Sequence, residues 1–320
     1  MSTPMPMRLI PTREFALYQL DRAGAQVAAA CAEPFDPVRH SGYKYGSTAA
    51  ADWFGRRLAA AFLARYPHTL AQPSVLIASS PYHRMPTAAA ALARAFRAAF
   101  NAERTAAGGA GLTAAPLVQI ERTSAAAGDY DLLSPESREQ SAAAAGLSFG
   151  GLSHFDLRGA HLIVVDDLKA TGAQQRALVR ASRALPLGSR TFLYTAALDP
   201  VSRAGFEPGT EDRLDHARIR TLRDLAGLLR ERVGDFAWNA RTCTFLLAPQ
   251  NRDALPEFLG RMPSRFVREL YCHSLNDGYA LMNAYRRSHG LIALELHSRG
   301  LLATDDVPVV ATASSRLLAA

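Results

Sequence analysis

The densest group of side chains able to do chemistry lies in residues 162–174, which read LIVVDDLKATGAQ. An apolar run ends in the adjacent carboxylates Asp166 and Asp167, and a Thr-Gly pair follows four residues after the second one. Backbone N–H groups at the start of a helix bind anions, and a glycine lets the backbone approach the anion closely. Carboxylates beside an anion site need a hydroxyl-bearing or metal-bound group between them. The spacing therefore indicates a phosphorylated sugar as ligand.

In this interpretation Asp166 and Asp167 accept hydrogen bonds from sugar hydroxyls, and the phosphate lies at the start of the following helix. The residues expected to bind the phosphate are Lys169, Ala170, Thr171, Gly172, Ala173 and Gln174. Lys169 and Lys44 are the only lysines among the 36 basic residues, so each is expected where a compact ammonium group is needed.

The elements that must position these residues alternate between strand and helix. Strands are predicted at 74–80, 117–122, 161–167 and 191–198, and helices at 47–66, 87–104 and 173–184. Unbroken apolar strands that alternate with helices are typical of a parallel sheet covered on both faces, and such sheets bind ligands at the carboxyl ends of their strands. Beyond residue 200 the pattern predicts a helix at 220–232, a further strand at 242–248 and mainly helices over 251–300.

The stretch VVDDLKATGAQ resembles the 5-phosphoribosyl-1-pyrophosphate (PRPP) motif of type I phosphoribosyltransferases. One residue departs from the motif, because Gln174 stands where the family usually has Thr or Ser. The resemblance implies an α/β fold, with a parallel sheet flanked by helices and an additional, mainly helical C-terminal region. It also implies that Mg²⁺ arrives with PRPP and lies near Asp166 and Asp167, without direct protein ligands. A second Asp-Asp pair, Asp305-Asp306, follows no predicted strand and precedes no Thr-Gly pair, so it does not match the motif.

The resemblance further implies a pyrophosphate-binding turn after an early strand. Residues 80–86 fit that place, and the residues expected to bind pyrophosphate are Ser80, Tyr82, His83 and Arg84. An exposed turn without a ligand explains His83 and Arg84 equally well.

Type I phosphoribosyltransferases also carry a mobile loop over the reacting centre, and the polar segment 123–155 occupies its place. Arg122 is the expected catalytic residue there, with Tyr130 and Arg138 as accessory lid residues; a plain solvated loop is the alternative for each. Lys44 lies between two tyrosines and two glycines, as expected for a second anion site, a lid over the base, or a helix cap with packed aromatic residues.

These expectations divide the chain into four parts. Residues 1–40 form an N-terminal extension, 41–200 the phosphoribosyltransferase-like core, 201–300 a helical hood and 301–320 a flexible tail. Three scattered cysteines exclude a disulfide framework, and neither they nor the nine histidines show metal-ligand spacing. No apolar stretch is long enough to span a membrane, so we expect a cytoplasmic protein.

The predicted function is transfer of a phosphoribosyl group from PRPP to a nitrogenous acceptor, or the reverse reaction. A looser resemblance over residues 40–300 is to phosphoribosyltransferase-like proteins of tellurite-resistance-type stress operons, which implies synthesis of a nucleoside-like metabolite. The alternatives are a PRPP-sensing regulator that binds nucleic acid or protein, and a hydrolase of a phosphoribosyl compound. The net charge of +7 does not by itself favour nucleic acid, because its arginines are dispersed along the chain. A homodimer is an alternative to a monomer, and the acceptor base is not determined by the sequence.

Overall fold

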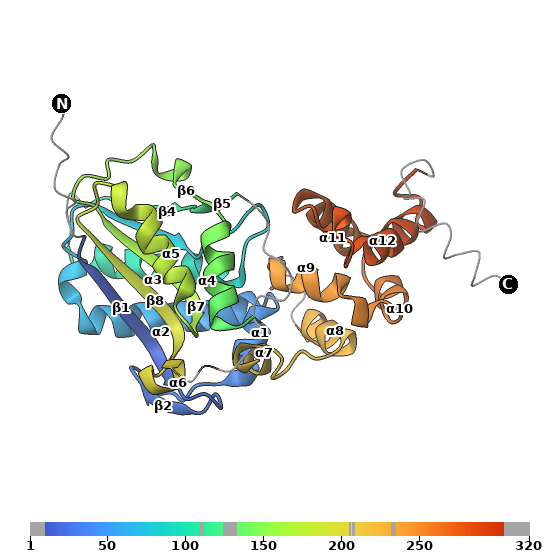
Figure 1. Ribbon diagram of the computed structural model, residues 1–320, viewed down its shortest axis with the longest axis horizontal. Coiled ribbons are helices and arrows are strands. Elements are labelled where there is room, and N and C mark those ends of the chain that lie inside the picture. The colour runs from blue at the N-terminus through green and yellow to red at the C-terminus, as the bar shows by residue number, and fades with distance from the viewer. Residues whose placement is uncertain are drawn as a thin grey trace.

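The protein consists of an α/β part and a group of C-terminal helices that lie beside it (Figure 1). A computed structural model describes residues 10–108, 112–123, 133–204, 206, 209–231 and 235–303. The strands are β1 (Thr12–Leu20), β2 (Gln26–Ala29), β3 (Val75–Ser79), β4 (Leu117–Val118), β5 (Glu121–Arg122), β6 (Leu147–Ser148), β7 (His161–Lys169) and β8 (Ser189–Leu198). This architecture confirms the predicted fold class.

Helices surround the sheet, and every named element described after β8 is a helix. They are α1 (Pro37–Lys44), α2 (Thr48–Arg65), α3 (Ala88–Ala106), α4 (Pro135–Ala144), α5 (Ala173–Ala181), α6 (Pro200–Ala204), α7 (Thr210–Asp215), α8 (Leu222–Glu231), α9 (Ala240–Leu247), α10 (Leu255–Gly260), α11 (Ser264–Asn276) and α12 (Arg286–Ser298). Among the described residues, none of these helices combines the length and the apolarity needed to cross a bilayer.

The main sheet has the strand order β2-β1-β8-β7-β3-β4. All neighbours pair in parallel except β2, which pairs antiparallel with β1 at one edge. Residues 161–165 of the central strand β7 are all buried, as expected for a strand with both faces covered. The parallel arrangement brings the carboxyl ends of β3, β7 and β8 to the same edge of the sheet.

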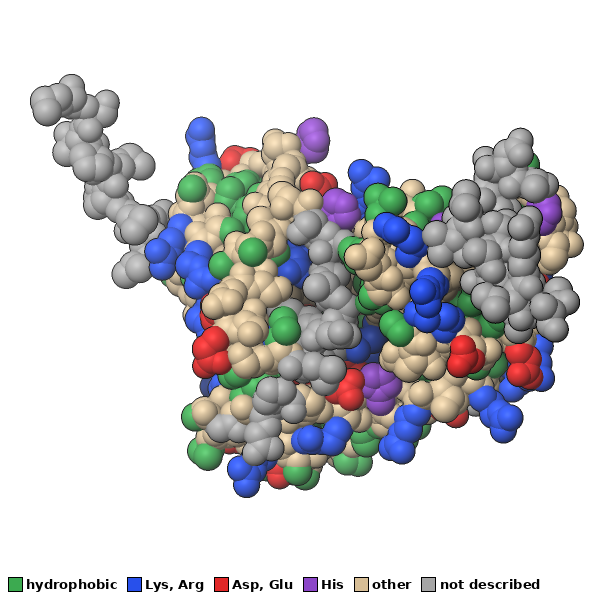
Figure 2. Space-filling model, turned by 45° about the vertical axis from the view of Figure 1, so that its right-hand side comes forward, with side chains coloured by type: hydrophobic (Ala, Val, Ile, Leu, Met, Phe, Trp, Pro, Cys, Tyr) green, Lys and Arg blue, Asp and Glu red, His purple; other side chains and the backbone are tan. Residues whose placement is uncertain are grey.

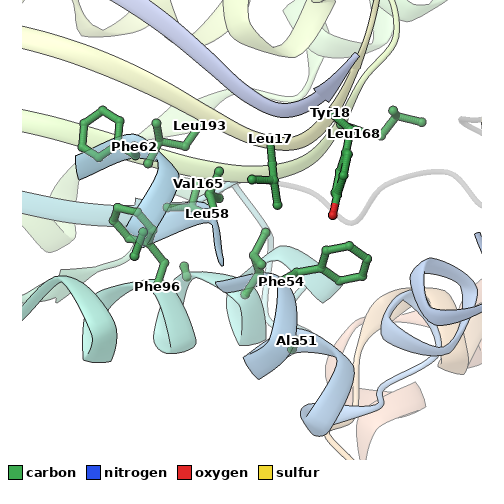
Figure 3. Close-up of a cluster of buried hydrophobic side chains, with 14 of the residues drawn as sticks. Leu17, Tyr18, Ala51, Phe54, Leu58, Phe62, Phe96, Val165, Leu168 and Leu193 are labelled. Carbon is green, nitrogen blue, oxygen red and sulfur yellow. The ribbon is translucent and has the colours of Figure 1, made fainter. Parts of the chain in front are cut away.

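The two faces of β7 pack against different layers. Ile163 and Val165 face a large core formed with α2 and α3, whereas Leu162 and Val164 face a smaller core that includes Leu178 of α5. Figure 3 shows part of the larger core, where strand side chains meet helix side chains: Leu17, Tyr18, Val165, Leu168 and Leu193 with Ala51, Phe54, Leu58, Phe62 and Phe96. Successive apolar side chains of β7 therefore point alternately into the two cores. This packing holds the strand between two layers and places its carboxyl end at the edge of the sheet where the other parallel strands end.

The N-terminal segment is a member of the main sheet rather than an extension. Residues 12–20 form β1, which pairs with β8 from Thr12↔Arg190 to Leu20↔Leu198. The prediction that residues 1–40 lie outside the core is therefore wrong for this strand. Its first residues are exposed and its buried residues lie near its carboxyl end, so its hydrophobic pattern is weak in the sequence.

The segment predicted as a strand at 242–248 is instead helix α9. The Asn239 side chain caps it by accepting a hydrogen bond from the Thr242 amide at 2.9 Å. Cys243, Leu246 and Leu247 are buried at the three- and four-residue spacing of a helix. A short apolar run does not distinguish a buried strand from a buried helix, and the tertiary packing here selects the helix.

The segment predicted as a long loop at 123–155 contains regular structure. Ser134 caps α4 through its side chain, α4 packs on α5, and β6 pairs with β5. Residues 135–148 are therefore not the structureless loop that the sequence pattern predicted. Tyr130 lies outside the described residues, as do residues 304–320 of the predicted tail.

Close contact between α2 and α3 depends on Gly55. A Cβ atom at this position would lie 2.5 Å from the Cβ of Ala95 and 2.8 Å from the amide nitrogen of Phe96. We predict that Gly55→Ala lowers the free energy of unfolding by about 1–3 kcal/mol, because the two helices must move apart. Denaturant unfolding measures the change.

Gly227→Ala is the matched control, because Gly227 lies within α8 and has nothing within 4 Å of an added Cβ. There the substitution should raise the free energy of unfolding by about 0.5–1 kcal/mol through helix propensity. Equal effects at the two positions would contradict the packing argument.

Candidate functional site

A cavity of about 190 Å³ opens at the carboxyl end of β7. The α/β part contributes residues 166–175 together with Lys44, Ser80, Thr87, Ala88, Arg122, Arg138 and Tyr194. The C-terminal part contributes Glu211, Ala240, Arg241, Thr244 and Tyr279. The segment singled out in the sequence therefore lines the cavity, and the C-terminal helices line it from the opposite side.

The adjacent carboxylates Asp166 and Asp167 have different partners. Asp167 pairs with the ammonium group of Lys44, whereas Asp166 accepts a hydrogen bond from the side-chain amide of Gln174 at 3.2 Å. Burial, and next the negative charge of Asp167, raise the pKa of Asp166 to about 7. Burial opposes ionisation of Asp167 as well, but Lys44 outweighs it and lowers the pKa of Asp167 below its ordinary value. Near neutral pH, Asp166 can therefore exchange a proton while Asp167 stays ionised.

The loop between β7 and α5 has the geometry expected of an anion cradle. Gly172 has φ = +77°, a left-handed conformation that only glycine adopts without strain, and it precedes α5 as its N-cap. The Thr171 hydroxyl accepts a hydrogen bond from the Ala173 amide at 3.3 Å. The amides at the start of α5 lie on the cavity wall, where the positive end of the helix favours an anion.

Lys169 lines the cavity, but its ammonium group pairs with Glu14 of β1. Glu14 also lies 3.6 Å from Arg203, and the Lys169 ammonium lies 5.8 Å from the ring centroid of Tyr194. Burial lowers the pKa of Lys169 more than Glu14 raises it. Part of the cationic character predicted for the phosphate site is thus already compensated by a carboxylate from the N-terminal strand.

The turn predicted to bind pyrophosphate is held by the C-terminal helices. The Asp277 carboxylate accepts hydrogen bonds from the amides of Arg84 at 3.1 Å and Met85 at 2.9 Å. The His83 ring contacts the carbonyl oxygen of Arg122 at 3.0 Å. Ser80 lines the cavity, but Tyr82, His83 and Arg84 are not among the residues that line it. The two amides most suited to an anion therefore already bind one.

The helix that follows this turn brings a second helix start to the cavity. Thr87 and Ala88, at the beginning of α3, line the wall beside Ser80, whose hydroxyl lies 3.2 Å from that of Thr87. Thr87 makes no side-chain cap to α3. The beginnings of α3 and α5 thus share one cavity, which suits a ligand with more than one anionic group.

The predicted catalytic and lid residues occupy different environments. Arg122 and Arg138 both line the cavity, but Arg138 is buried, pairs with Glu211 and lies 4.6 Å from the ring centroid of Phe206. Lys44 also lines the cavity. Arg138 is therefore part of the cavity wall rather than of a mobile lid.

Several cavity residues carry no signal in the sequence. Glu211, Arg241, Thr244 and Tyr279 come from the C-terminal part and match no local motif. Among the described residues, no group of three or more His, Cys, Asp or Glu side chains is arranged to hold a metal ion. The basic side chains on the face seen in Figure 2 are scattered and do not gather into one stripe.

Comparison with known proteins places this geometry in a family. Residues 12–292 match the model of the PRTase ComF-like family. The chain belongs to this family. The match spans β1, the cavity and most of the C-terminal helices, so the family unit includes both parts of the structure. Membership confirms the resemblance to the type I phosphoribosyltransferase-like superfamily and supports a phosphoribosyltransferase-like function. No curated protein and no solved structure matches the chain.

The carboxylate pair predicts a pH dependence. A carboxylate accepts hydrogen bonds from sugar hydroxyls, so affinity for ribose 5-phosphate should rise as the pH increases through about 7, where Asp166 ionises. In Asp167→Asn this rise should occur at lower pH, because the neighbouring negative charge is gone. Calorimetric titration between pH 5 and pH 9 measures the dissociation constants.

The ligand phosphate itself titrates near pH ~6, so Asp166→Asn is the control. It should remove the transition that belongs to the carboxylate and keep the one that belongs to the phosphate. If the dissociation constants of Asp166→Asn and of the wild type depend on pH in the same way, the transition does not belong to Asp166.

The two hydrogen bonds that Asp277 accepts predict that its carboxylate stabilises the fold. Asp277→Ala leaves two backbone amides without their acceptor and should lower the free energy of unfolding by about 1–3 kcal/mol. Asp277→Asn retains an acceptor oxygen and should lower the free energy of unfolding by a smaller amount. Chemical denaturation of both variants tests this, and equal losses would show that the negative charge matters rather than the hydrogen bonds.

Proposed function

We propose that the protein is a phosphoribosyltransferase that uses PRPP, with Mg²⁺, to transfer a phosphoribosyl group to a nitrogenous acceptor. The observation that carries this proposal is that Asp166 lies on the same cavity wall as the start of α5, which Gly172 precedes. The distance along the chain from the carboxylates to Gly172 suits a sugar that bears a terminal phosphate. Family membership agrees with this assignment.

Each wall of the cavity then has a role. The amides of residues 171–174 hold the 5′-phosphate, and Asp166 accepts hydrogen bonds from the ribose hydroxyls. Lys44 and Arg122 supply positive charge toward the pyrophosphate group. Thr244 and Tyr279 of the C-terminal part face the remaining space, where the acceptor must lie.

In the reaction, the acceptor nitrogen donates its lone pair to C1 of the ribose. The bond from C1 to the pyrophosphate oxygen breaks, and its electron pair leaves with the pyrophosphate. Positive charge that develops on the sugar ring is stabilised by the ionised Asp167 nearby. The nitrogen loses its proton, and Asp166 is suited to accept it because its pKa is about 7.

Magnesium fits this site as a companion of the ligand. Mg²⁺ prefers oxygen ligands and is usually held by one or two carboxylates together with substrate phosphates. In this site the ion would be held by the phosphate oxygens of the ligand and would lie near Asp166 and Asp167 without a direct protein ligand. When bound, the ion would neutralise charge on the departing pyrophosphate.

One observation favours a second candidate, a protein that senses PRPP without turning it over. A transferase must keep water from the reacting sugar, usually by closing a mobile loop. Arg138, which was expected on that loop, is instead buried in an ion pair with Glu211. A sensor would need the phosphate cradle but no closing loop.

Calorimetry with PRPP and Mg²⁺, followed by a pyrophosphate-release assay over a panel of nitrogenous bases, tests the proposal. The double variant Asp166→Asn, Asp167→Asn should weaken PRPP binding by about 1–3 kcal/mol and abolish pyrophosphate release. The double variant Asp305→Asn, Asp306→Asn removes the other Asp-Asp pair of the sequence and should behave as the wild type.

Two results would contradict the transferase. Unchanged PRPP affinity in the first double variant would remove the sugar-binding role. PRPP binding without pyrophosphate release from any base, together with a PRPP-dependent and salt-sensitive affinity for nucleic acid, would favour the sensor.

A further inference from the structure

Helix α7 carries two buried acids at the edge of the cavity. Glu211 and Asp215 are four residues apart, so they lie on the same side of the helix. Asp215 has no exposed surface, and Glu211 lines the cavity while only 8% of its surface is exposed. In Figure 1, α7 lies next to α1, at the junction between the sheet and the C-terminal helices.

Each acid binds basic side chains from other elements. One oxygen of Asp215 lies 3.3 Å from the Lys44 ammonium and 2.5 Å from the Arg241 guanidinium. Glu211 pairs with Arg138. Lys44 comes from α1, Arg138 from α4 and Arg241 from α9, and all three line the cavity. One short helix thus contacts cations from three elements that are distant in the sequence.

The position of α7 is itself fixed. The Ser41 hydroxyl of α1 donates a hydrogen bond to the backbone carbonyl of Asp215 at 2.5 Å, and His40 lies 3.3 Å from the second carboxylate oxygen. A buried carboxylate is costly unless cations and hydrogen-bond donors surround it. The carboxylates also act on the cations, because a long basic side chain keeps one conformation only where a partner compensates its loss of rotamer freedom. The acids of α7 are therefore suited to orient these cations.

The number of cations exceeds what a single phosphate needs. The start of α5 already forms a cradle for one phosphate, on backbone amides and the Thr171 hydroxyl. The cations bound by α7 lie elsewhere on the cavity wall. Asp215, Asp167 and Glu211 balance their charge, but the guanidinium groups of Arg138 and Arg241 each carry five N–H donors, more than one carboxylate accepts. A ligand with a second anionic group, separate from the first phosphate, can bind to the cradle and to these cations at the same time.

We propose that the two carboxylates of α7 are positioning residues that hold three basic side chains toward the cavity for the second anionic group of the ligand. The inference rests on the proposed function, in which that group is the pyrophosphate of PRPP. The carboxylates do not touch the ligand; they act through the cations. Loss of Asp215 affects two of the cations, and loss of Glu211 affects the third.

The experiment measures the dissociation constants of PRPP and of ribose 5-phosphate, both with Mg²⁺, for the wild type and for variants. Asp215→Asn should raise the dissociation constant of PRPP about tenfold, the order expected when charge-assisted contacts are misplaced. It should change that of ribose 5-phosphate less than about twofold, because the cradle at α5 is untouched. A general loss of structure would weaken both ligands alike, so the difference between them identifies positioning.

Asp212→Asn is the matched control, since Asp212 lies on the same helix, its side chain is 40% exposed, and among the described residues it pairs with His216. It should bind both ligands as the wild type does. Glu211→Gln acts mainly on Arg138, the cation that Glu211 pairs with, and should raise the dissociation constant of PRPP about threefold. This second variant keeps the test decisive if Asp215→Asn fails to fold, which thermal unfolding reveals.

The outcomes separate this inference from the function on which it rests. Failure of the wild type to bind PRPP would overturn the proposed function, and the inference with it. Wild-type binding of PRPP that is unchanged in the folded variants would overturn the inference alone. Equal weakening of PRPP and ribose 5-phosphate in the folded variants would also overturn it, because that result indicates a structural role.

Discussion

The ammonium group of Lys44 lies between the carboxylates of Asp167 and Asp215, and the geometry of the cavity depends on this contact. Asp167 lies near the carboxyl end of the central strand, and Asp215 belongs to α7. Asp215 is fully buried and the other two side chains are largely buried, so removal of any one leaves a charge without its partner where water solvates it poorly. Since Arg241 binds the same oxygen of Asp215, the constraint extends from the sheet into the C-terminal helices.

A cavity built in this way has two walls with different properties. The wall formed by β7 and α5 is rigid, because β7 is hydrogen-bonded on both sides and packed on both faces. The opposite wall comes from helices that meet the α/β part through polar and apolar contacts. Asp277 binds the turn after β3, and Tyr45 and Met85 of the α/β part pack into the core of the C-terminal helices.

The departure of Gln174 from the type I phosphoribosyltransferase motif has a structural counterpart. Its amide donates to Asp166 rather than standing free as a phosphate-binding group. The two adjacent acids thus have different partners. Burial and the charge of Asp167 raise the pKa of Asp166, whereas Lys44 lowers the pKa of Asp167. Adjacent acids with opposite pKa shifts can divide the work of proton exchange and charge stabilisation between them.

The sequence by itself determined the parallel sheet, the cradle at the start of α5 and the acid pair, because all of these follow from local patterns: apolar strands, the left-handed Gly172 and the spacing from Asp167 to Thr171. It missed β1, whose exposed first half weakens its pattern, and α9, whose short apolar run suits strand and helix alike. Only the tertiary structure decided the partners of Lys44, the burial of Arg138 and the acceptor that the turn at Arg84 binds. Those depend on Asp215, Glu211 and Asp277, which contact these groups in space but are remote from them along the chain. Ion pairs and hydrogen bonds between such distant segments leave no periodic pattern in a sequence.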